Sequence, residues 1–386
     1  MTGGRALGGR CAVAVALVAF GVGPAAVAAP AAAASPLVSD GAAFVWHLPR
    51  GFPTPAVPAD NPMSTAKVAL GRRLFFEPRL SVTGRYSCAS CHEPTRAYTD
   101  GRALAVGATG QPLIHSAMSL VNVAYNISFG WTKPEVLSLE QQMLEPLLNE
   151  HPVELGVAGR EAAVCAVLSA DPEYRDAFAQ AFPRDAAVES AVVAGDRAPS
   201  GRAPSGRGTS GAAGDGAPAT AAALGPVTFT NIVKAIAAFE RTLIAGASSF
   251  DRYVFGGEHD ALSPQAKRGM QLFYSPRAAC GTCHSGFNFN GNWRDSHGGT
   301  GEAAFANNGL TDRPMRVPTL RNIALTAPYM DDGRFKTLEA VLDHYASVAQ
   351  LPASDPKLRT FNLSPDERAD VIAFLQALTE PELPGR

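Results

Sequence analysis

The stretch Ser87-Cys88-Ala89-Ser90-Cys91-His92-Glu93 decides how this chain is interpreted, because its central pentapeptide returns as Cys280-Gly281-Thr282-Cys283-His284. Cys-x-x-Cys-His is the attachment sequence of c-type haem. Two thiols a short turn apart can add across the two vinyl groups of one porphyrin, and the adjoining histidine supplies an axial nitrogen to the iron. A single copy would also suit a redox dithiol or half of a zinc site. Two copies favour haem and predict two covalently bound haem c groups, held by Cys88, Cys91 and His92 and by Cys280, Cys283 and His284.

Residues 1–35 have the organisation of a secretory signal peptide. Arg5 and Arg10 precede the apolar run 11–22, and small residues follow at 25–29. The run is shorter than the ~20 residues of a typical membrane-spanning helix. An uncleaved membrane anchor is the alternative. No later apolar stretch is long enough to span a bilayer, so we expect a periplasmic or otherwise exported protein with no membrane span after cleavage of the signal.

Composition bounds the remaining possibilities. The 386 residues suit about two domains, and 46% of them are hydrophobic, enough for two sizeable cores. The formal net charge of -2 gives no basic surface, so nucleic acid is not expected as a partner. Of the six cysteines, Cys11 lies in the signal peptide and four belong to the two motifs. Cys165 lies in an apolar helical run and is interpreted as a small core residue.

The mature chain contains an internal repeat. The segment 71–79 precedes the first motif, and the similar segment 269–277 precedes the second. The apolar-periodic segment 232–239 likewise resembles 371–375. This duplication predicts a mainly α fold of two cytochrome c-like haem domains in tandem, at 36–255 and 256–386. The segment 186–226, rich in Ala, Gly, Ser and Pro, is predicted to be a flexible surface insertion in the first domain.

Further stretches resemble the bacterial di-haem cytochrome c peroxidase and MauG superfamily, most of all its MbnH branch. They are Trp46 to Pro53, Asp60 to Met63, Glu150 to Gly156, Phe239 to Leu243 and Val317 to Met330. The resemblance covers nearly all of the mature chain apart from the insertion. It implies an enzyme that acts on hydrogen peroxide.

The resemblance assigns roles at the first haem. The haem ligated by His92 corresponds to the peroxide site of the family, with an open sixth position on the iron. Glu154 corresponds to the distal glutamate and Gln142 to the distal glutamine, although the interval between them is longer than in the ordinary peroxidases. A carboxylate beside the iron can take a proton from one peroxide oxygen and return it to the other. The alternative for Glu154 is a solvated loop acid.

At the second haem, ligated by His284, the resemblance places Tyr345 where ordinary peroxidases have a methionine ligand. A thioether favours ferrous iron, whereas a hard oxygen ligand favours higher oxidation states. His344 as the ligand, with Tyr345 only packing, is the alternative. Trp131 corresponds to the tryptophan that carries charge between the haems of relatives, and a core aromatic is its other interpretation.

The family also holds a calcium ion between its domains. Backbone carbonyls of Thr326 and Pro328 correspond to two of its ligands, and Ser116 stands where relatives have an asparagine. Two further departures are Asp331 in place of a histidine and His115 in place of an arginine. For His115 we expect a position at the surface or behind the haem ligands.

The resulting hypothesis is an exported di-haem peroxidase. It uses hydrogen peroxide at the first haem to generate a high-valent di-haem state, which oxidises a residue on a partner protein. One alternative is an ordinary cytochrome c peroxidase fed by a small cytochrome c or cupredoxin, against which Tyr345 argues. Another is a non-catalytic di-haem electron carrier, against which Glu154 and Gln142 argue. A zinc or disulfide-bonded structural protein would bind no haem.

Overall fold

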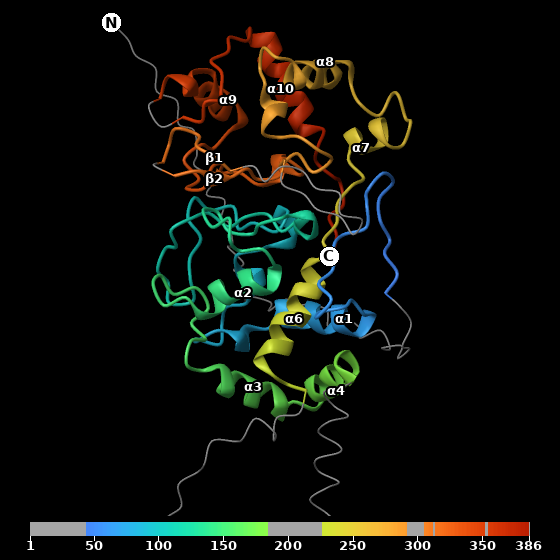
Figure 1. Ribbon diagram of the computed structural model, residues 1–386, viewed down its shortest axis with the longest axis vertical. Helices are drawn as coiled ribbons and strands as arrows, with labels where there is room; N and C mark the ends of the chain where they lie inside the picture. The colour runs from blue at the N-terminus through green and yellow to red at the C-terminus, as the bar shows by residue number, and fades with distance from the viewer. Residues whose placement is uncertain (1–43, 184–225, 292–304, 312, 352–353, 386) are drawn as a thin grey trace, which may run out of the picture. The chain divides into compact units, whose positions relative to one another are not determined.

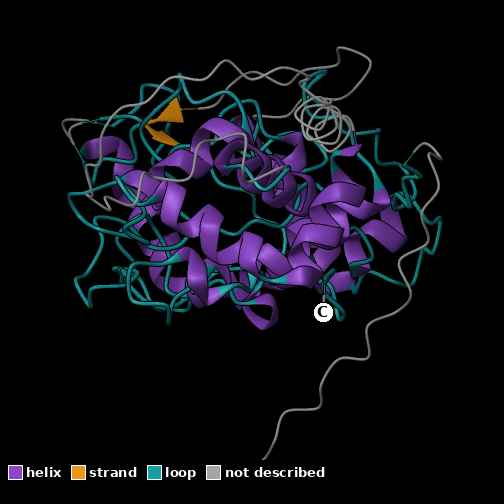
Figure 2. Cartoon of the chain, turned by 90° about the horizontal axis from the view of Figure 1, so that it is seen from below, coloured by secondary structure: helices purple, strands orange, loops and turns teal. Residues whose placement is uncertain are grey.

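Helices dominate the regular structure of the chain. The computed structural model describes residues 44–183, 226–291, 305–311, 313–351 and 354–385, and within these ranges the strands form one short antiparallel pair (Figure 2). The helices are α1 (Thr65–Phe75), α2 (Leu139–Leu148), α3 (Glu161–Ala170), α4 (Pro172–Ala181), α6 (Phe229–Glu240), α7 (Ser249–Val254), α8 (Pro264–Tyr274), α9 (Leu338–Ser347) and α10 (Pro365–Gln376), and the strands are β1 (Phe305–Ala306) and β2 (Met315–Arg316). The mainly α prediction is confirmed.

Several sequence predictions fall outside the described residues. They are the signal peptide at 1–35 and the insertion at 186–226, of which only Pro226 is described. The domain limits, 36–255 and 256–386, stay a prediction. Within the described ranges, no helix is both long enough and apolar enough to cross a membrane.

Two helix pairs form the centres of the two halves. Helix α1 packs against α6, and α8 packs against α10 (Figure 1). Ser64 begins α1 by accepting a hydrogen bond from the Lys67 amide at 3.2 Å, and Ser263 begins α8 in the same way. Each pair contributes aromatic residues to a separate buried cluster: Phe75 and Phe239 in the first, Phe273 and Phe374 in the second. The predicted duplication is confirmed in both helix pairs.

One glycine in each half lets its two helices approach closely. A β-carbon added to Gly71 would lie 1.8 Å from the Ala235 carbonyl oxygen, and one added to Gly269 would lie 1.8 Å from that of Asp370. These distances are far below van der Waals contact and involve backbone atoms, which cannot move without separating the helices. Glycine is therefore required at both crossings.

Replacing Gly269 with alanine is expected to destabilise the protein by at least about 1–3 kcal/mol, the range for overpacked cores. Chemical denaturation of the haem-loaded protein, followed by circular dichroism, measures the loss. Gln271→Ala on the exposed face of the same helix is the control and should change stability little. Equal stability of the Gly269→Ala protein and the wild type would contradict the packing argument.

A second repeat, not identified in our sequence analysis, follows each motif. Segments 117–125 and 317–325 align residue for residue around Asn122 and Asn322, which have left-handed backbone angles (φ 59° and 60°). The Asn122 side chain forms two 2.9 Å hydrogen bonds with the backbone of Ala245. The Asn322 side chain accepts from the Glu380 amide at 2.8 Å. Each asparagine thus ties the loop after the haem motif to the chain that follows the closing helix.

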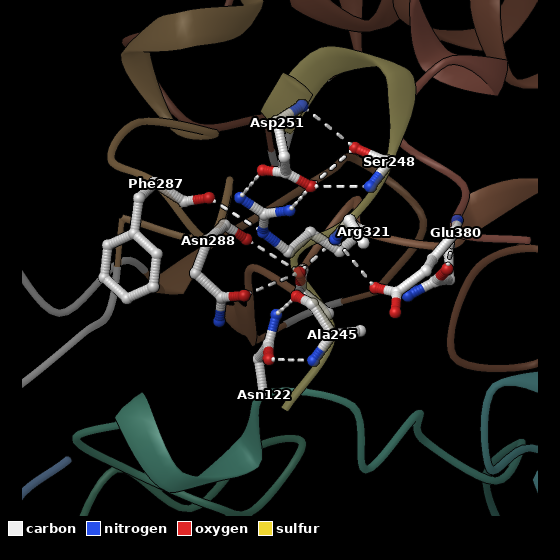
Figure 3. A network of polar contacts seen from close by, with 11 residues as sticks. Asn122, Ala245, Ser248, Asp251, Phe287, Asn288, Arg321 and Glu380 are labelled. Atoms are coloured by element: carbon white, nitrogen blue, oxygen red, sulfur yellow. Dashed lines mark hydrogen bonds and ion pairs between the residues drawn. The ribbon is translucent and has the colours of Figure 1, made fainter. Parts of the chain in front are cut away.

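A buried ion pair holds the second half together (Figure 3). Arg321 directs both terminal nitrogens at Asp251, each at 2.9 Å, and its Nε donates to the Phe287 carbonyl at 2.8 Å. Asp251 also accepts from the Ser248 hydroxyl at 2.6 Å. The exposed fractions of the Arg321 and Asp251 side chains are 1% and 3%, so the pair is shielded from solvent. The first half has Val121 at the matching position, so this pair belongs to one copy of the repeat.

Candidate haem-binding and peroxide site

The two Cys-x-x-Cys-His motifs share one local conformation. Each begins with a single 3₁₀ turn, at Cys88–Ser90 and at Cys280–Thr282. The amide of His92 donates to the Cys88 carbonyl at 2.9 Å, and that of His284 to the Cys280 carbonyl at 3.0 Å. This winding brings two thiols and one imidazole together over a single turn, as attachment of one porphyrin requires.

The two imidazoles are oriented in the same way. Nδ1 of His92 lies 2.9 Å from the Tyr98 carbonyl, and Nδ1 of His284 lies 2.8 Å from the Phe289 carbonyl. A carbonyl only accepts, so Nδ1 carries the proton and Nε2 keeps the lone pair that binds iron. Tyr98 and Phe289 both have positive φ, 60° and 53°, an unusual conformation for bulky residues and one typical of functional loops.

Burial favours the neutral, iron-binding form of both histidines. It lowers the pKa of His92 and lowers the pKa of His284 to about 4. None of the four motif cysteines is in a disulfide bond with another described cysteine, so all four are available for attachment of haem. Within the described residues, no three or more His, Cys, Asp or Glu side chains gather as a metal site, so the zinc interpretation lacks a ligand set there. The residues present fit covalently attached haem.

A cavity of about 240 Å³ lies at the second motif. It is lined by Cys280, Cys283 and His284 and by Tyr345 of α9. Burial raises the pKa of the Tyr345 phenol above its usual range. The neighbouring His344 instead directs Nε2 at the Asn308 carbonyl, 2.8 Å away. Of the two candidates for the far ligand of the second haem, Tyr345 lines this cavity and His344 is engaged elsewhere.

Trp131 connects the first half of the chain to the same cavity. Its indole lines the cavity, and Nε1 donates to the Ser116 carbonyl at 3.1 Å. Its own carbonyl accepts from the Arg316 amide at 2.8 Å. Trp131 is partly exposed and is absent from both buried clusters. These contacts favour a role between the haems over a core aromatic, although the role stays a prediction.

Glu154 lies near the first motif. Its backbone carbonyl accepts from the Ala108 amide at 2.6 Å, in the turn that follows α2. Burial, reinforced by the charge of Glu145, raises the pKa of Glu154 to about 7. The Cys91 thiol contacts the Val106 carbonyl at 3.8 Å, and Val106 lies two residues before Ala108, so the Glu154 backbone is bonded to the loop that contacts the haem-attachment turn. A solvated loop acid would not have its pKa raised by burial.

Gln142 is less well defined by its surroundings. It lies on α2, partly exposed, next to the buried Met143. Among the described residues, no hydrogen bond joins its side chain to Glu154. Its role beside the first haem therefore rests on the resemblance.

The two departures from the family pattern contact each other. His115 Nδ1 lies 3.3 Å from a carboxylate oxygen of Asp331, and the His115 ring lies 6.1 Å from that of Trp131. The sequence alone indicates no role for Asp331. The structure pairs it with the other exchanged residue.

The residues of the predicted calcium site line the cavity as well. Ser116, Thr326 and Pro328 are all among its lining residues. The Ser116 hydroxyl donates to the Met330 carbonyl at 3.1 Å, and its amide donates to the Asp331 carbonyl at 2.6 Å. The three are near one another, and calcium binding stays a prediction.

Comparison with known proteins identifies the family. Residues 65–259 match the di-haem cytochrome c peroxidase family, and residues 266–379 match cytochrome c. The chain is 32% identical to the methylamine utilization protein MauG of Methylorubrum extorquens, over 88% of this chain and 86% of that protein. This chain belongs to the di-haem cytochrome c peroxidase family. Its two tandem cytochrome c-type domains therefore carry two haem c groups, and the protein is an oxidoreductase acting on peroxide.

Relatives of this di-haem peroxidase include both cytochrome c peroxidases and MauG-type proteins. The cytochrome-c peroxidase IdrP1 of Denitromonas iodatirespirans is 30% identical, over 86% of this chain and 89% of its own length. Among solved structures, a MauG-like protein associated with microbial copper homeostasis is 32% identical, with a TM-score of 0.74 over 88% of this chain and 96% of its own. Similarity to both groups leaves the reductant open.

Proposed function

We propose that this di-haem peroxidase is an exported enzyme of the MauG type, which uses hydrogen peroxide to oxidise a residue on a partner protein. The observation that carries the proposal is Tyr345 on the lining of the cavity with Cys280, Cys283 and His284. An ordinary cytochrome c peroxidase would have a methionine there. The signal-like segment 1–35 supports export.

Haem, when attached at both motifs, supplies the redox chemistry with peroxide. Glu154 acts as the acid–base group at the first haem. With a pKa of about 7, it exists in both protonation states near neutral pH, so it can accept a proton from one peroxide oxygen and return it to the other. Gln142 assists by orienting the bound peroxide.

Tyr345 and Trp131 determine where the oxidising equivalents go. As a ligand of the second haem, the Tyr345 oxygen would stabilise oxidised iron and would make that haem a poor acceptor for electrons from a small cytochrome. Trp131 lines the same cavity and links it to the first half of the chain through Ser116 and Arg316. The partner would be oxidised at the protein surface by electron transfer through such groups. The MauG protein and the MauG-like structure among the relatives support this proposal.

A Tyr345→Met exchange tests the proposal. The haem-loaded protein is treated with one equivalent of hydrogen peroxide while its near-infrared absorption is recorded, and peroxide turnover is measured with a reduced small cytochrome c. The wild type should form a long-lived oxidised state with little turnover. Tyr345→Met should lose that state and gain turnover, because a thioether favours ferrous iron.

Tyr329→Phe is the matched control. Tyr329 lines the same cavity, but its hydroxyl bonds to the Ile323 carbonyl at 3.2 Å, so its loss should leave the long-lived state intact. Rapid cytochrome-dependent turnover by the wild type would instead identify an ordinary cytochrome c peroxidase. Two low-spin haems in the ferric EPR spectrum that do not respond to peroxide would identify an electron carrier.

A further inference from the structure

Arg316 is a buried cation without a counter-ion among the described residues. It lies at the end of β2, and only 5% of its surface is exposed. No carboxylate in the described ranges lies within ion-pair distance of its guanidinium, and its Nε has no hydrogen-bond partner. The contrast with Arg321 is direct, because that equally buried arginine is fully paired with Asp251. An ionised guanidinium is rarely buried unless it is paired.

Arg316 lies beside the cavity of the second motif. Arg316 lines that cavity together with Cys280, Cys283 and His284. Its backbone is fixed on both sides, by pairing with Phe305 of β1 and by the 2.8 Å bond from its amide to the Trp131 carbonyl. The side chain is therefore held at the cavity wall by rigid elements.

Arg316 also lies between the loops that hold the two axial histidines. Its guanidinium contacts the sulfur of Met118, and the neighbouring Ser119 hydroxyl donates to the Ala97 carbonyl at 2.6 Å, in the loop that holds His92. Three residues further along its own chain, the Thr319 hydroxyl donates to the Asn288 carbonyl at 2.7 Å, next to Phe289, whose carbonyl holds the His284 ring. A charge at Arg316 is thus close to both haem-binding loops.

A c-type haem brings two carboxylates, its propionates, into such a cavity. The planar guanidinium can bind a carboxylate through two parallel hydrogen bonds, the strongest arrangement for this kind of pair. We propose that Arg316 is the counter-ion of a propionate of the haem attached at Cys280 and Cys283, and that it places a fixed positive charge between the two haem-binding loops. This inference rests on haem attachment and is independent of how the protein uses peroxide.

The pairing has two measurable consequences. The propionate bending bands in the resonance Raman spectrum respond to the hydrogen bonds that the carboxylate accepts. The reduction potential responds to the charge, because a nearby cation favours addition of an electron. Removing the cation should therefore lower the potential of the second haem.

The experiment compares Arg316→Met and Arg316→Lys with the wild type, all haem-loaded and without peroxide. Arg316→Met should shift a propionate band and reduce the equilibrium constant for reduction of one haem by about tenfold, which corresponds to about 59 mV. Arg316→Lys keeps the charge but not the two-pronged geometry, so it should shift the band with a smaller change in potential. Arg252→Gln, which removes an exposed arginine paired with Glu258, is the control and should change neither.

Unchanged propionate bands and potentials in Arg316→Met would overturn the proposal. Higher thermal stability of that variant with unchanged spectra would also overturn it. Such a result would show that Arg316 has no ionic partner in the haem-loaded protein. Should Arg316→Met fail to accumulate with two haems, Arg316→Lys decides alone, and unchanged bands in that variant overturn the proposal. Because no measurement uses peroxide, failure here is distinct from failure of the MauG-type function.

Discussion

Replacing Glu154 with glutamine is expected to slow the reaction with hydrogen peroxide by about 10²–10⁴-fold, the usual contribution of a positioned acid–base group. Glutamine keeps the shape of the side chain but cannot accept the peroxide proton. Stopped-flow absorption of the haem-loaded protein, mixed with excess peroxide, measures the rate. Glu150→Gln is the matched control, because Glu150 is an exposed carboxylate four residues earlier.

The pH profile separates this role from a structural one. Burial and the charge of Glu145 raise the pKa of Glu154 to about 7, so the carboxyl is mostly protonated below pH 7 and mostly ionised above it. Only the ionised form accepts a proton. The wild-type rate should therefore rise as the pH passes through about 7 and level off above it, while the glutamine variant has no such step. A rate within threefold of wild type, with the step retained, would remove Glu154 from the mechanism.

Replacing Arg321 with methionine is expected to destabilise the protein by about 3–5 kcal/mol. This loss in the free energy of unfolding is larger than the net contribution of the ion pair, because Asp251 stays buried with an uncompensated charge. Denaturant titration of the haem-loaded protein, followed by circular dichroism, measures it. The exposed pair between Arg252 and Glu258 supplies the control, and Arg252→Met should cost no more than about 1 kcal/mol.

A double variant tests the cause of that loss. Exchanging Asp251 for leucine together with Arg321→Met removes both charges, and it should recover a large part of the stability. A double variant no more stable than Arg321→Met alone would assign the cost to lost packing instead. Arg321 lies against the Phe52 ring, 4.7 Å from its centroid, so such packing is the competing explanation.

The sequence was informative wherever a residue type has few uses. The two pentapeptides allowed the haem attachment to be predicted, and repeated segments predicted the helices α1, α6, α8 and α10, although not which of them pack together. Glu154 could be assigned only through the family resemblance, since a single acid in a loop has no periodicity. The structure adds what a one-dimensional pattern cannot contain, namely that Glu154 is half-buried and that its backbone is bonded to the loop that contacts Cys91.

Other features could not be predicted because they depend on contacts between distant segments. His115 and Asp331 are 216 positions apart in the chain and meet only in the fold. No motif in the sequence distinguishes Arg316 from other arginines. It is notable only because, among the described residues, no carboxylate pairs with its buried side chain. Tyr345 and His344 are adjacent, so only the direction of each side chain separates them.

The two backbone carbonyls that hold the axial histidines limit how mutation can change the reactivity of the haems. The groups that accept from His92 and His284 are peptide oxygens of Tyr98 and Phe289, which every amino acid carries. Substitution of either residue therefore leaves the chemical identity of the acceptor unchanged. The electron-donating character of both imidazoles is in this sense protected from point mutation. A difference in reactivity between the two haems therefore comes from the side chains around the other face and the edges of each haem.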